Sequence, residues 1–277
     1  MNLVVQGPAL SRADADSLAS ELKTKSVQQK NENAFVLVEP TIRKSLDAWS
    51  EAHKADHAWI EKPRRFADLK LLAMDMDSTL ITIECIDELG DLAGKKAEVA
   101  GITARAMRGE IDYPQSLRER VSLLAGLPVS ALERVYQERL RLTPGAQALI
   151  AACKKHGVKI LLVSGGFTFF VERLKERLAL DYTISNVLEI ERNKLTGKVT
   201  GDIIGAEAKA TRFLSVMKDL KATKDQTVAI GDGANDLKMM AEAGASIAFH
   251  AKPVVRTQAT YALTWSGLDG VLNLFTA

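Results

Sequence analysis

The chain has 277 residues, of which 47% are hydrophobic and 26% are charged, as in an average soluble globular protein. These proportions argue against a fibrous or largely disordered chain. Lys and Arg total 37 and Asp and Glu total 35, so the formal net charge of +2 supports neither a nucleic-acid nor a membrane partner. Because the chain has two cysteines, no apolar run of bilayer-spanning length and no leader-like start, we expect a cytoplasmic protein.

Residues 1–66 are predicted to form a small α+β domain of their own. Stretches with strand character lie at 3–6, 26–30, 34–38 and 57–60. One helix is expected between the first two stretches, and another from Pro40 onward with Leu46 and Trp49 on one face. This β-α-β-β-α-β order is the ferredoxin-like pattern, and the charged, Pro-containing stretch 61–65 is interpreted as a linker.

Residues 67–277 are predicted to form a larger domain in which strands and helices alternate. Near-continuous apolar runs, typical of strands buried on both faces of a parallel sheet, lie at 70–74, 158–163, 227–230 and 245–249. Helical patterns between or after them lie at 145–155, 167–179, 207–220 and 234–243. Gly244 is expected to cap the last of these helices. The alternation predicts an α/β fold with a doubly wound parallel sheet of Rossmann type.

Two insertions interrupt this alternation. About sixty mainly helical residues lie between Ile81 and Leu142, far more than the dozen or so that a crossover needs. They are predicted to form a small helical cap over the sheet, at about 84–141. Residues 183–200 predict a β-hairpin that turns near 192–194.

Polar side chains and glycines follow three of the predicted strands at the point where each strand ends. In chain order they are Asp75, Asp77, Ser164, Gly165, Asp232 and Asp236. Lys209 lies in the helix that leads to the third of these strands. Because ligands bind outside the carboxyl ends of strands in doubly wound sheets, we expect these groups to meet at one edge.

The chemistry of this set points to phosphoryl transfer. Four carboxylates repel one another unless a cation binds, and all-oxygen ligands suit Mg²⁺. Glycines allow backbone N–H groups to approach an anion, and Lys209 can act as a point charge on phosphate. An aspartate can attack phosphorus and form an aspartyl-phosphate, and Asp77 is placed to act as general acid and base.

The strand-end motifs resemble those of the haloacid dehalogenase superfamily of phosphatases. They stand at 75–80, 164–166 and 231–236, with Lys209 before the last. The likeness covers roughly residues 71–251 and is specific, because the motifs follow in the right order around a helical insertion. Ser78, Glu84 and the stretch 115–124 narrow the resemblance to the phosphoserine phosphatases of this superfamily.

The resemblance implies roles for the strand-end residues. Asp75 would be the nucleophile and a Mg²⁺ ligand, and Asp77 the general acid and base with its backbone carbonyl on the metal. Asp232 and Asp236 would complete the metal site. The phosphoryl group would be held or lined by Ser164, Gly165, Lys209 and Asn235.

The resemblance also implies the substrate. Glu84 would face the ammonium group of L-phosphoserine, and Arg120 would grip its carboxylate with two parallel hydrogen bonds. The implied reaction releases L-serine and phosphate, the last step of serine biosynthesis. The family often has Phe where this chain has Tyr113, seven residues before Arg120.

Two other functions remain open on the sequence. The same aspartyl-phosphate could pass its phosphoryl group to an alcohol such as homoserine, which would make the chain a phosphotransferase. A phosphorylated aspartate at a sheet edge also occurs in signalling receiver domains, although Asp77 and the cap argue against a long-lived phospho-switch. The amino-terminal domain weakly resembles regulatory domains of some bacterial relatives, and effector binding or a homodimer stays open.

Overall fold

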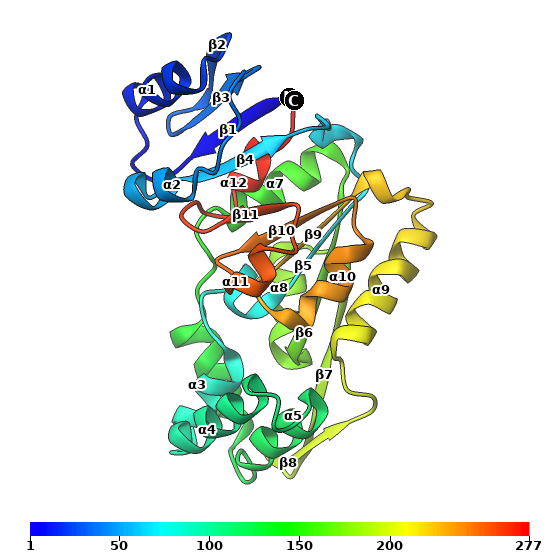
Figure 1. Ribbon diagram of the computed structural model, residues 1–277. Helices are drawn as coiled ribbons and strands as arrows, with labels where there is room; N and C mark the ends of the chain where they lie inside the picture. Colours follow the sequence, from blue (N-terminus) through cyan, green and yellow to red (C-terminus); the bar gives the residue numbers. More distant parts are fainter. Residues whose placement is uncertain (277) are drawn as a thin grey trace.

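The computed structural model describes residues 1–276 and shows a small amino-terminal unit, a larger core and a helical cap at the opposite end (Figure 1). The amino-terminal unit contains a four-stranded antiparallel sheet in the order β2-β3-β1-β4. Its elements are β1 (Asn2–Gln6), α1 (Arg12–Leu22), β2 (Ser26–Asn31), β3 (Ala34–Val38), α2 (Asp47–His53) and β4 (Asp56–Ile60). The predicted ferredoxin-like order of elements is confirmed.

The second helix of this unit begins later than predicted, at Asp47 instead of Pro40. The backbone N–H groups of Thr41 and Ile42 donate to the carbonyl of Leu22 at the end of α1, at 3.2 and 3.1 Å. These bonds tie the chain to the end of α1, and the helix starts only after this contact. Two tertiary hydrogen bonds thus decide where the helix begins, and the local apolar periodicity does not.

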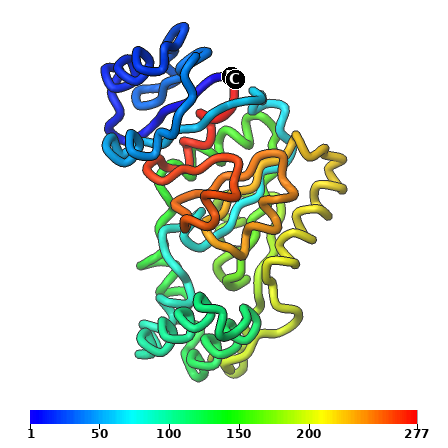
Figure 2. The backbone as a smooth tube through the Cα atoms, viewed as in Figure 1, coloured from blue at the N-terminus to red at the C-terminus, as the bar shows by residue number. Residues whose placement is uncertain are grey.

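The amino-terminal sheet joins the core through its second face. Leu3 and Val5 of β1 pack with α1, whereas Val4 between them belongs to the hydrophobic cluster of the core. The buried carboxylate of Asp56 adds a polar anchor, because it accepts the backbone N–H groups of residues 264–266 at 2.6 to 3.2 Å. The carboxyl-terminal segment accordingly runs beside the amino-terminal unit in Figure 2.

The core is built on a seven-stranded sheet in the order β11-β10-β9-β5-β6-β7-β8. All neighbouring strands pair in parallel except β7 and β8, which form the predicted hairpin. The strands are β5 (Leu71–Met74), β6 (Lys159–Phe167), β7 (Tyr182–Glu191), β8 (Lys194–Thr200), β9 (Thr227–Gly231), β10 (Ala245–Phe249) and β11 (Tyr261–Leu263). The doubly wound α/β fold predicted for this part is confirmed.

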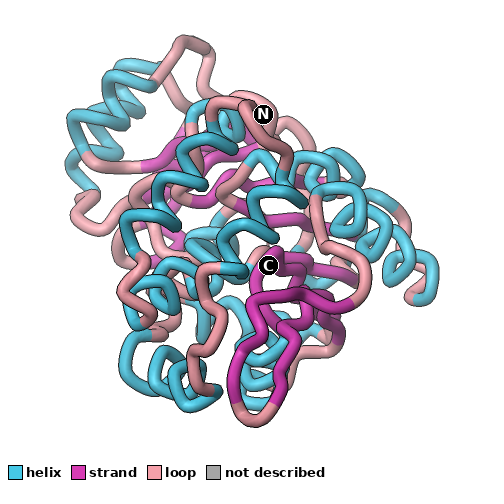
Figure 3. The backbone as a smooth tube through the Cα atoms, turned by 90° about the horizontal axis from the view of Figure 1, so that it is seen from below, coloured by secondary structure: helices cyan, strands magenta, loops and turns pink. Residues whose placement is uncertain are grey.

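Helices cover both faces of the sheet, as the view in Figure 3 shows. In the central strand β5, Leu72 and Met74 pack toward α7 and α8, and Leu71 and Ala73 pack toward α9 and α10. Burial on both faces is why these strands read as continuous apolar runs. The helices of the core are α7 (Ala146–His156), α8 (Thr168–Leu178), α9 (Ala206–Asp219), α10 (Leu237–Glu242), α11 (Pro253–Arg256) and α12 (Gly270–Asn273).

The prediction for Gly244 was wrong. The helix expected over 234–243 is a 3₁₀ turn over Ala234–Asp236 followed by the short helix α10, and Gly244 does not adopt the left-handed conformation of a cap. A Cβ atom at Gly244 would lie 2.2 Å from the carbonyl oxygen of Lys224. This glycine is needed because another segment of backbone passes close to it.

The insertion after β5 forms the predicted helical cap. Its helices are α3 (Cys85–Leu92), α4 (Lys96–Met107), α5 (Tyr113–Ser122) and α6 (Val129–Arg134). The two ends of the insertion meet at an antiparallel bridge between Ile81 and Leu142. The β7–β8 hairpin is joined to the cap, because the N–H of Gly126 donates to the carbonyl of Leu195 at 2.8 Å and Leu195 donates back to Leu127 at 2.9 Å. Cap and hairpin therefore form one continuous structure.

Candidate active site

The chain leaves the central strand β5 at Asp75 and turns immediately. Met76–Leu80 form one wide turn that is interrupted at Asp77 and Ser78, whose backbone angles are not helical; φ of Ser78 is 53°. The N–H of Asp75 donates to the carbonyl of Ile230 in the neighbouring strand at 3.1 Å. The Asp75 carboxylate accepts the N–H of Met76 at 2.7 Å. These bonds fix the Asp75 carboxylate at the carboxyl edge of the sheet.

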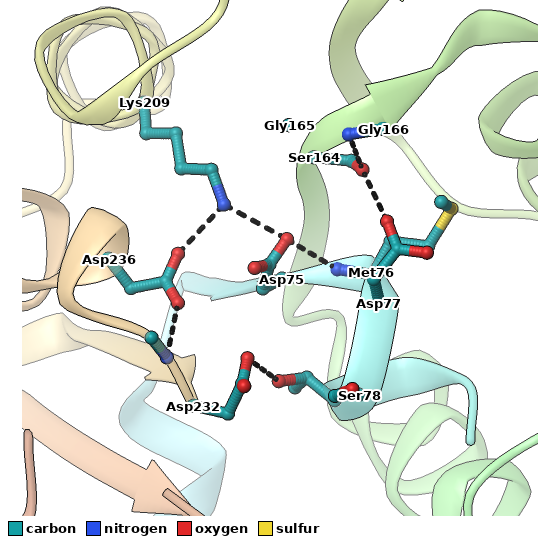
Figure 4. A network of polar contacts seen from close by, with 12 residues as sticks. Asp75, Met76, Asp77, Ser78, Ser164, Gly165, Gly166, Lys209, Asp232 and Asp236 are labelled. Atoms are coloured by element: carbon teal, nitrogen blue, oxygen red, sulfur yellow. Dashed lines mark hydrogen bonds and ion pairs between the residues drawn. The ribbon is translucent and has the colours of Figure 1, made fainter. Parts of the chain in front are cut away.

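Lys209, on α9, is fully buried between two carboxylates (Figure 4). Its Nζ lies 2.9 Å from Oδ1 of Asp75 and 2.8 Å from Oδ1 of Asp236. Burial alone would lower the pKa of Lys209, but the carboxylates of Asp236 and Asp75 raise it, so the side chain stays cationic. The other oxygen of Asp236 accepts the N–H of Gly233 at 3.1 Å. A fixed positive charge thus lies beside Asp75.

Three carboxylates form a group that can hold a metal ion. Asp75, Asp232 and Asp236 each contribute one oxygen, and these oxygens lie within 4.8 Å of one another. Burial and the neighbouring Asp236 raise the pKa of Asp232 to about 6, and burial and Asp236 also raise the pKa of Asp75. A hard divalent cation relieves this repulsion and matches the all-oxygen donor set. The Thr79 hydroxyl orients Asp232 at 3.4 Å.

Asp77 lies to one side of this group, with its carboxylate toward the end of β6. One oxygen accepts the N–H of Cys85 at 2.8 Å, and the other accepts the hydroxyl of Ser164 at 3.4 Å. The Ser164 hydroxyl oxygen in turn accepts the N–H of Gly166 at 2.8 Å. Burial raises the pKa of Asp77, so this carboxyl can hold a proton at a higher pH than an exposed aspartate. That property suits a general acid.

The remaining predicted residues surround these acids. Glu84 precedes α3 of the cap and accepts the hydroxyl of Ser78 at 2.6 Å. Arg120 is a half-buried residue of α5, and its Nε donates to the carbonyl of Ser116 at 3.3 Å. Asn235 lies in the turn after β9, folded back over the backbone there. Two cap residues of opposite charge and one core amide thus accompany the acids.

Sequence reasoning missed three contacts of this site. The bond from Thr79 to Asp232 could have been suspected, because Thr79 belongs to the motif that follows β5. The buried Asn186 on β7 carried no sequence signal, yet its side-chain amide donates to the carbonyl of Gly165 at 2.8 Å. The Tyr113 hydroxyl donates to the same carbonyl at 3.0 Å. The contacts of Asn186 and Tyr113 do not follow from sequence spacing, because each joins segments that are distant in the chain.

The class of the site follows from three features: acids at the sheet edge that can bind a cation, a buried lysine, and two glycines at the end of β6 beside Asp77. It is suited to phosphoryl transfer through a carboxylate. A family profile described as haloacid dehalogenase-like hydrolase matches residues 72–241. The chain belongs to this family.

Individual relatives are similar over most of the chain. A phosphoserine phosphatase of Polaromonas sp. (strain JS666 / ATCC BAA-500) is 55% identical over 215 residues, which are 76% of this chain and 91% of that protein. The phosphoserine phosphatase of Vibrio cholerae is 46% identical over 227 residues, 82% of this chain and 69% of the relative.

Solved structures agree with these similarities. The unliganded structure of a probable phosphoserine phosphatase from Vibrio cholerae has a TM-score of 0.83 and 39% identity, over 99% of this chain and 85% of the other. A substrate-bound phosphoserine phosphatase has a TM-score of 0.71 and 39% identity, over 75% of this chain and 99% of the other. Among residues 1–276, no helix combines the length and the apolar character needed to cross a membrane.

Proposed function

We propose that this chain hydrolyses L-phosphoserine to L-serine and phosphate. The observation that carries the proposal is the buried group of Asp75, Lys209 and Asp236, in which a carboxylate at the sheet edge lies 2.9 Å from a permanent cation. The relatives with high identity over most of the chain, all phosphoserine phosphatases by name, support the choice of substrate. The proposed activity belongs to the last step of serine biosynthesis, in the cytoplasm.

The proposed reaction has two displacements at phosphorus. In the first, a carboxylate oxygen of Asp75 attacks, the bond from phosphorus to the serine oxygen breaks, and Asp77 gives its proton to that oxygen. In the second, Asp77 takes a proton from a water molecule that attacks the aspartyl-phosphate. The bond from phosphorus to Asp75 breaks, phosphate leaves, and both aspartates return to their initial states.

The surrounding groups would hold the phosphoryl group during both steps. Lys209 supplies positive charge beside Asp75, and Ser164 and Gly165 offer a hydroxyl and a backbone N–H at the end of β6. Asn235 would line the same space. The carboxylates of Asp75, Asp232 and Asp236 and the backbone carbonyl of Asp77 would hold Mg²⁺. The ion would neutralise the charge that develops on the phosphoryl oxygens.

The amino-acid part of the substrate is assigned to the cap. Glu84 would face the ammonium group and Arg120 the carboxylate, and neither residue belongs to the acid group of the core. Since the cap lies over the carboxyl edge of the sheet, binding there would also exclude water from the site. Recognition and chemistry would then reside in different parts of the fold.

Replacing Arg120 by Ala is expected to lower kcat/KM for phosphoserine by roughly 100-fold, because a charge-assisted, bidentate contact is lost. Hydrolysis of p-nitrophenyl phosphate, which has no carboxylate, should change less than about threefold. Steady-state kinetics with both substrates measure this. Arg118→Ala is the matched control, since Arg118 is an exposed residue of the same helix. Equal losses on both substrates would contradict the assignment of Arg120.

Mg²⁺ is expected to stabilise the protein more at about pH 7.5 than at about pH 5. The pKa of Asp232 in the folded protein is about 6, above the ordinary value of 3.8, so the folded state binds extra protons. Without a cation, stability is therefore lost as the pH rises from about 4 through about 6. The raised pKa values of Asp75 and Asp77 act in the same direction.

Thermal unfolding with EDTA or with about 5 mM Mg²⁺ at both pH values measures this effect. The Asp232→Asn variant should lose most of the Mg²⁺-induced increase in Tm at about pH 7.5, because one metal ligand is gone. A Mg²⁺ effect that is absent, or identical at the two pH values, would contradict a cation site made of these carboxylates.

The division into an amino-terminal domain of residues 1–66 and a phosphatase domain of residues 67–277 is also part of the proposal. The shared hydrophobic cluster that includes Val4 and Phe66 supports a rigid attachment of the two. Binding of an amino-acid effector by the amino-terminal domain, or formation of a homodimer through it, would be measured by serine inhibition and by light scattering of the full chain.

A further inference from the structure

One carbonyl in the site accepts hydrogen bonds from two different parts of the fold. The Gly165 carbonyl accepts the side-chain amide of Asn186 at 2.8 Å and the hydroxyl of Tyr113 at 3.0 Å. Asn186 is a buried residue of β7 in the core, whereas Tyr113 is the first residue of helix α5 in the cap. The first donor belongs to the sheet, and the second belongs to the insertion.

The peptide that carries this carbonyl leads directly to the acids. At its other end is the N–H of Gly166, which donates to the Ser164 hydroxyl oxygen at 2.8 Å. That hydroxyl donates to Asp77 at 3.4 Å. A continuous chain of hydrogen bonds therefore runs from Tyr113 through one peptide plane to Ser164 and Asp77, and such chains strengthen their members cooperatively.

This peptide plane lies in an irregular part of the sheet. It joins two glycines, and the pairing of β6 with β7 is irregular between Val163 and Phe167, where the plane lies. A peptide between glycines can rotate at low energetic cost, because no Cβ atom restricts it. Both glycines also leave room for side chains of the site, since a Cβ atom at Gly165 would lie 2.4 Å from the Tyr113 hydroxyl and one at Gly166 would lie 2.6 Å from Asp77.

Asn186 also contacts the segment that precedes α9. Its side-chain oxygen accepts the N–H of Ile204 at 2.8 Å, just before the helix that carries Lys209. The ring of Tyr113 lies against the same segment, because a Cβ atom at Gly205 would be 3.4 Å from it. The two donors thus link the end of β6, which carries Ser164, to the start of α9, the helix that carries Lys209.

We propose that Asn186 and the Tyr113 hydroxyl are positioning residues that hold the Gly165–Gly166 peptide in the orientation that directs Ser164 toward Asp77. Asn186 holds the carbonyl at all times, and Tyr113 holds it only while the cap lies over the core. The cap thereby helps to order the phosphoryl site. This inference rests on the proposed phosphatase chemistry, but it applies to any phosphate ester.

The Tyr113→Phe variant keeps the ring and removes only the hydroxyl. We expect kcat/KM to fall by about 3- to 10-fold, the effect of one neutral hydrogen bond, and by the same factor for phosphoserine and p-nitrophenyl phosphate. The Ki of inorganic phosphate as a competitive inhibitor should rise by a similar factor. Tyr136→Phe is the matched control, because Tyr136 is a cap tyrosine whose hydroxyl has no hydrogen-bond partner within residues 1–276.

The Asn186→Asp variant keeps the acceptor for Ile204 and replaces the donor to Gly165 by an acceptor. Its losses should exceed those of Tyr113→Phe, and Tyr113→Phe should cost more in the Asn186→Asp background, where the hydroxyl is the remaining donor. If the loss in kcat/KM of the double variant equals the product of the two single losses, the proposal that both donors act on one peptide is overturned.

Other results would also overturn it. An unchanged Ki of phosphate in Tyr113→Phe would mean that the hydroxyl does not act on the phosphoryl site. A loss confined to phosphoserine would mean that the hydroxyl contacts the amino-acid part of the substrate instead. If phosphoserine proved not to be a substrate, the p-nitrophenyl phosphate and inorganic phosphate measurements would still decide the role of Tyr113.

Discussion

In the Asp75→Asn variant, turnover of phosphoserine is expected to fall by at least about 10⁴-fold, because a carboxamide cannot attack phosphorus and carry the phosphoryl group. The variant should nevertheless fold. The amide oxygen can still accept the N–H of Met76, and Lys209 keeps its second partner, Asp236. Since burial and Asp236 raise the pKa of Asp75, loss of the charge also removes a source of repulsion. The melting temperature should therefore be unchanged or higher.

Acid quenching during turnover of ³²P-labelled phosphoserine measures the intermediate directly. The unmodified protein should retain label on the chain, and Asp75→Asn should retain none. Asp202→Asn serves as control, since Asp202 is an exposed acid without a hydrogen-bonded partner in the described part of the chain. Turnover of Asp75→Asn within tenfold of the unmodified protein would exclude the covalent route.

The Lys209→Met variant is expected to lose about 3–5 kcal/mol of unfolding free energy, because two buried carboxylates are left without their cation. Asp75 and Asp236 would then repel each other. Water screens this repulsion little, because the two residues are only 5% and 0% exposed. Activity should fall by at least about 100-fold for every phosphate ester, since Lys209 also supplies charge beside the phosphoryl group.

Urea denaturation measures the stability change, and Lys238→Met is its matched control. Lys238 forms an exposed ion pair with Glu207 on the same face of the core, so its loss should cost less than about 1 kcal/mol. Adding Asp236→Asn to Lys209→Met should recover part of the lost stability, because one of the stranded charges is removed. A loss in Lys209→Met no larger than in Lys238→Met would contradict the buried ion-pair group.

The core was predictable because its signals are local and repeated. Strands such as Leu71–Met74 are apolar on both faces, and the parallel sheet requires that. Predictions failed where a distant segment decided the outcome. The chain after Pro40 bonds to the end of α1, and Gly244 is dictated by the Lys224 carbonyl, so neither is visible in a local pattern.

Some features of the candidate site could likewise be predicted from the sequence, and others could not. The acids that follow β5 and β9 could be expected together, because the carboxyl ends of neighbouring parallel strands share one edge. Their roles, and those of Glu84 and Arg120, stay predictions until the variants are measured. The bonds from Tyr113 and Asn186 to Gly165 could not be expected, since each depends on how an insertion or a neighbouring strand is seated.

The sequence alone thus determined which chemical groups this protein brings to its sheet edge, because strand ends and helix periods are encoded within a few residues. Only the tertiary structure decided their protonation and orientation. Burial of Lys209 between two carboxylates, and the two donors on the Gly165 carbonyl, arise from segments far apart in the chain. Electrostatic and hydrogen-bond energies depend on distance in space, and sequence spacing does not specify that distance.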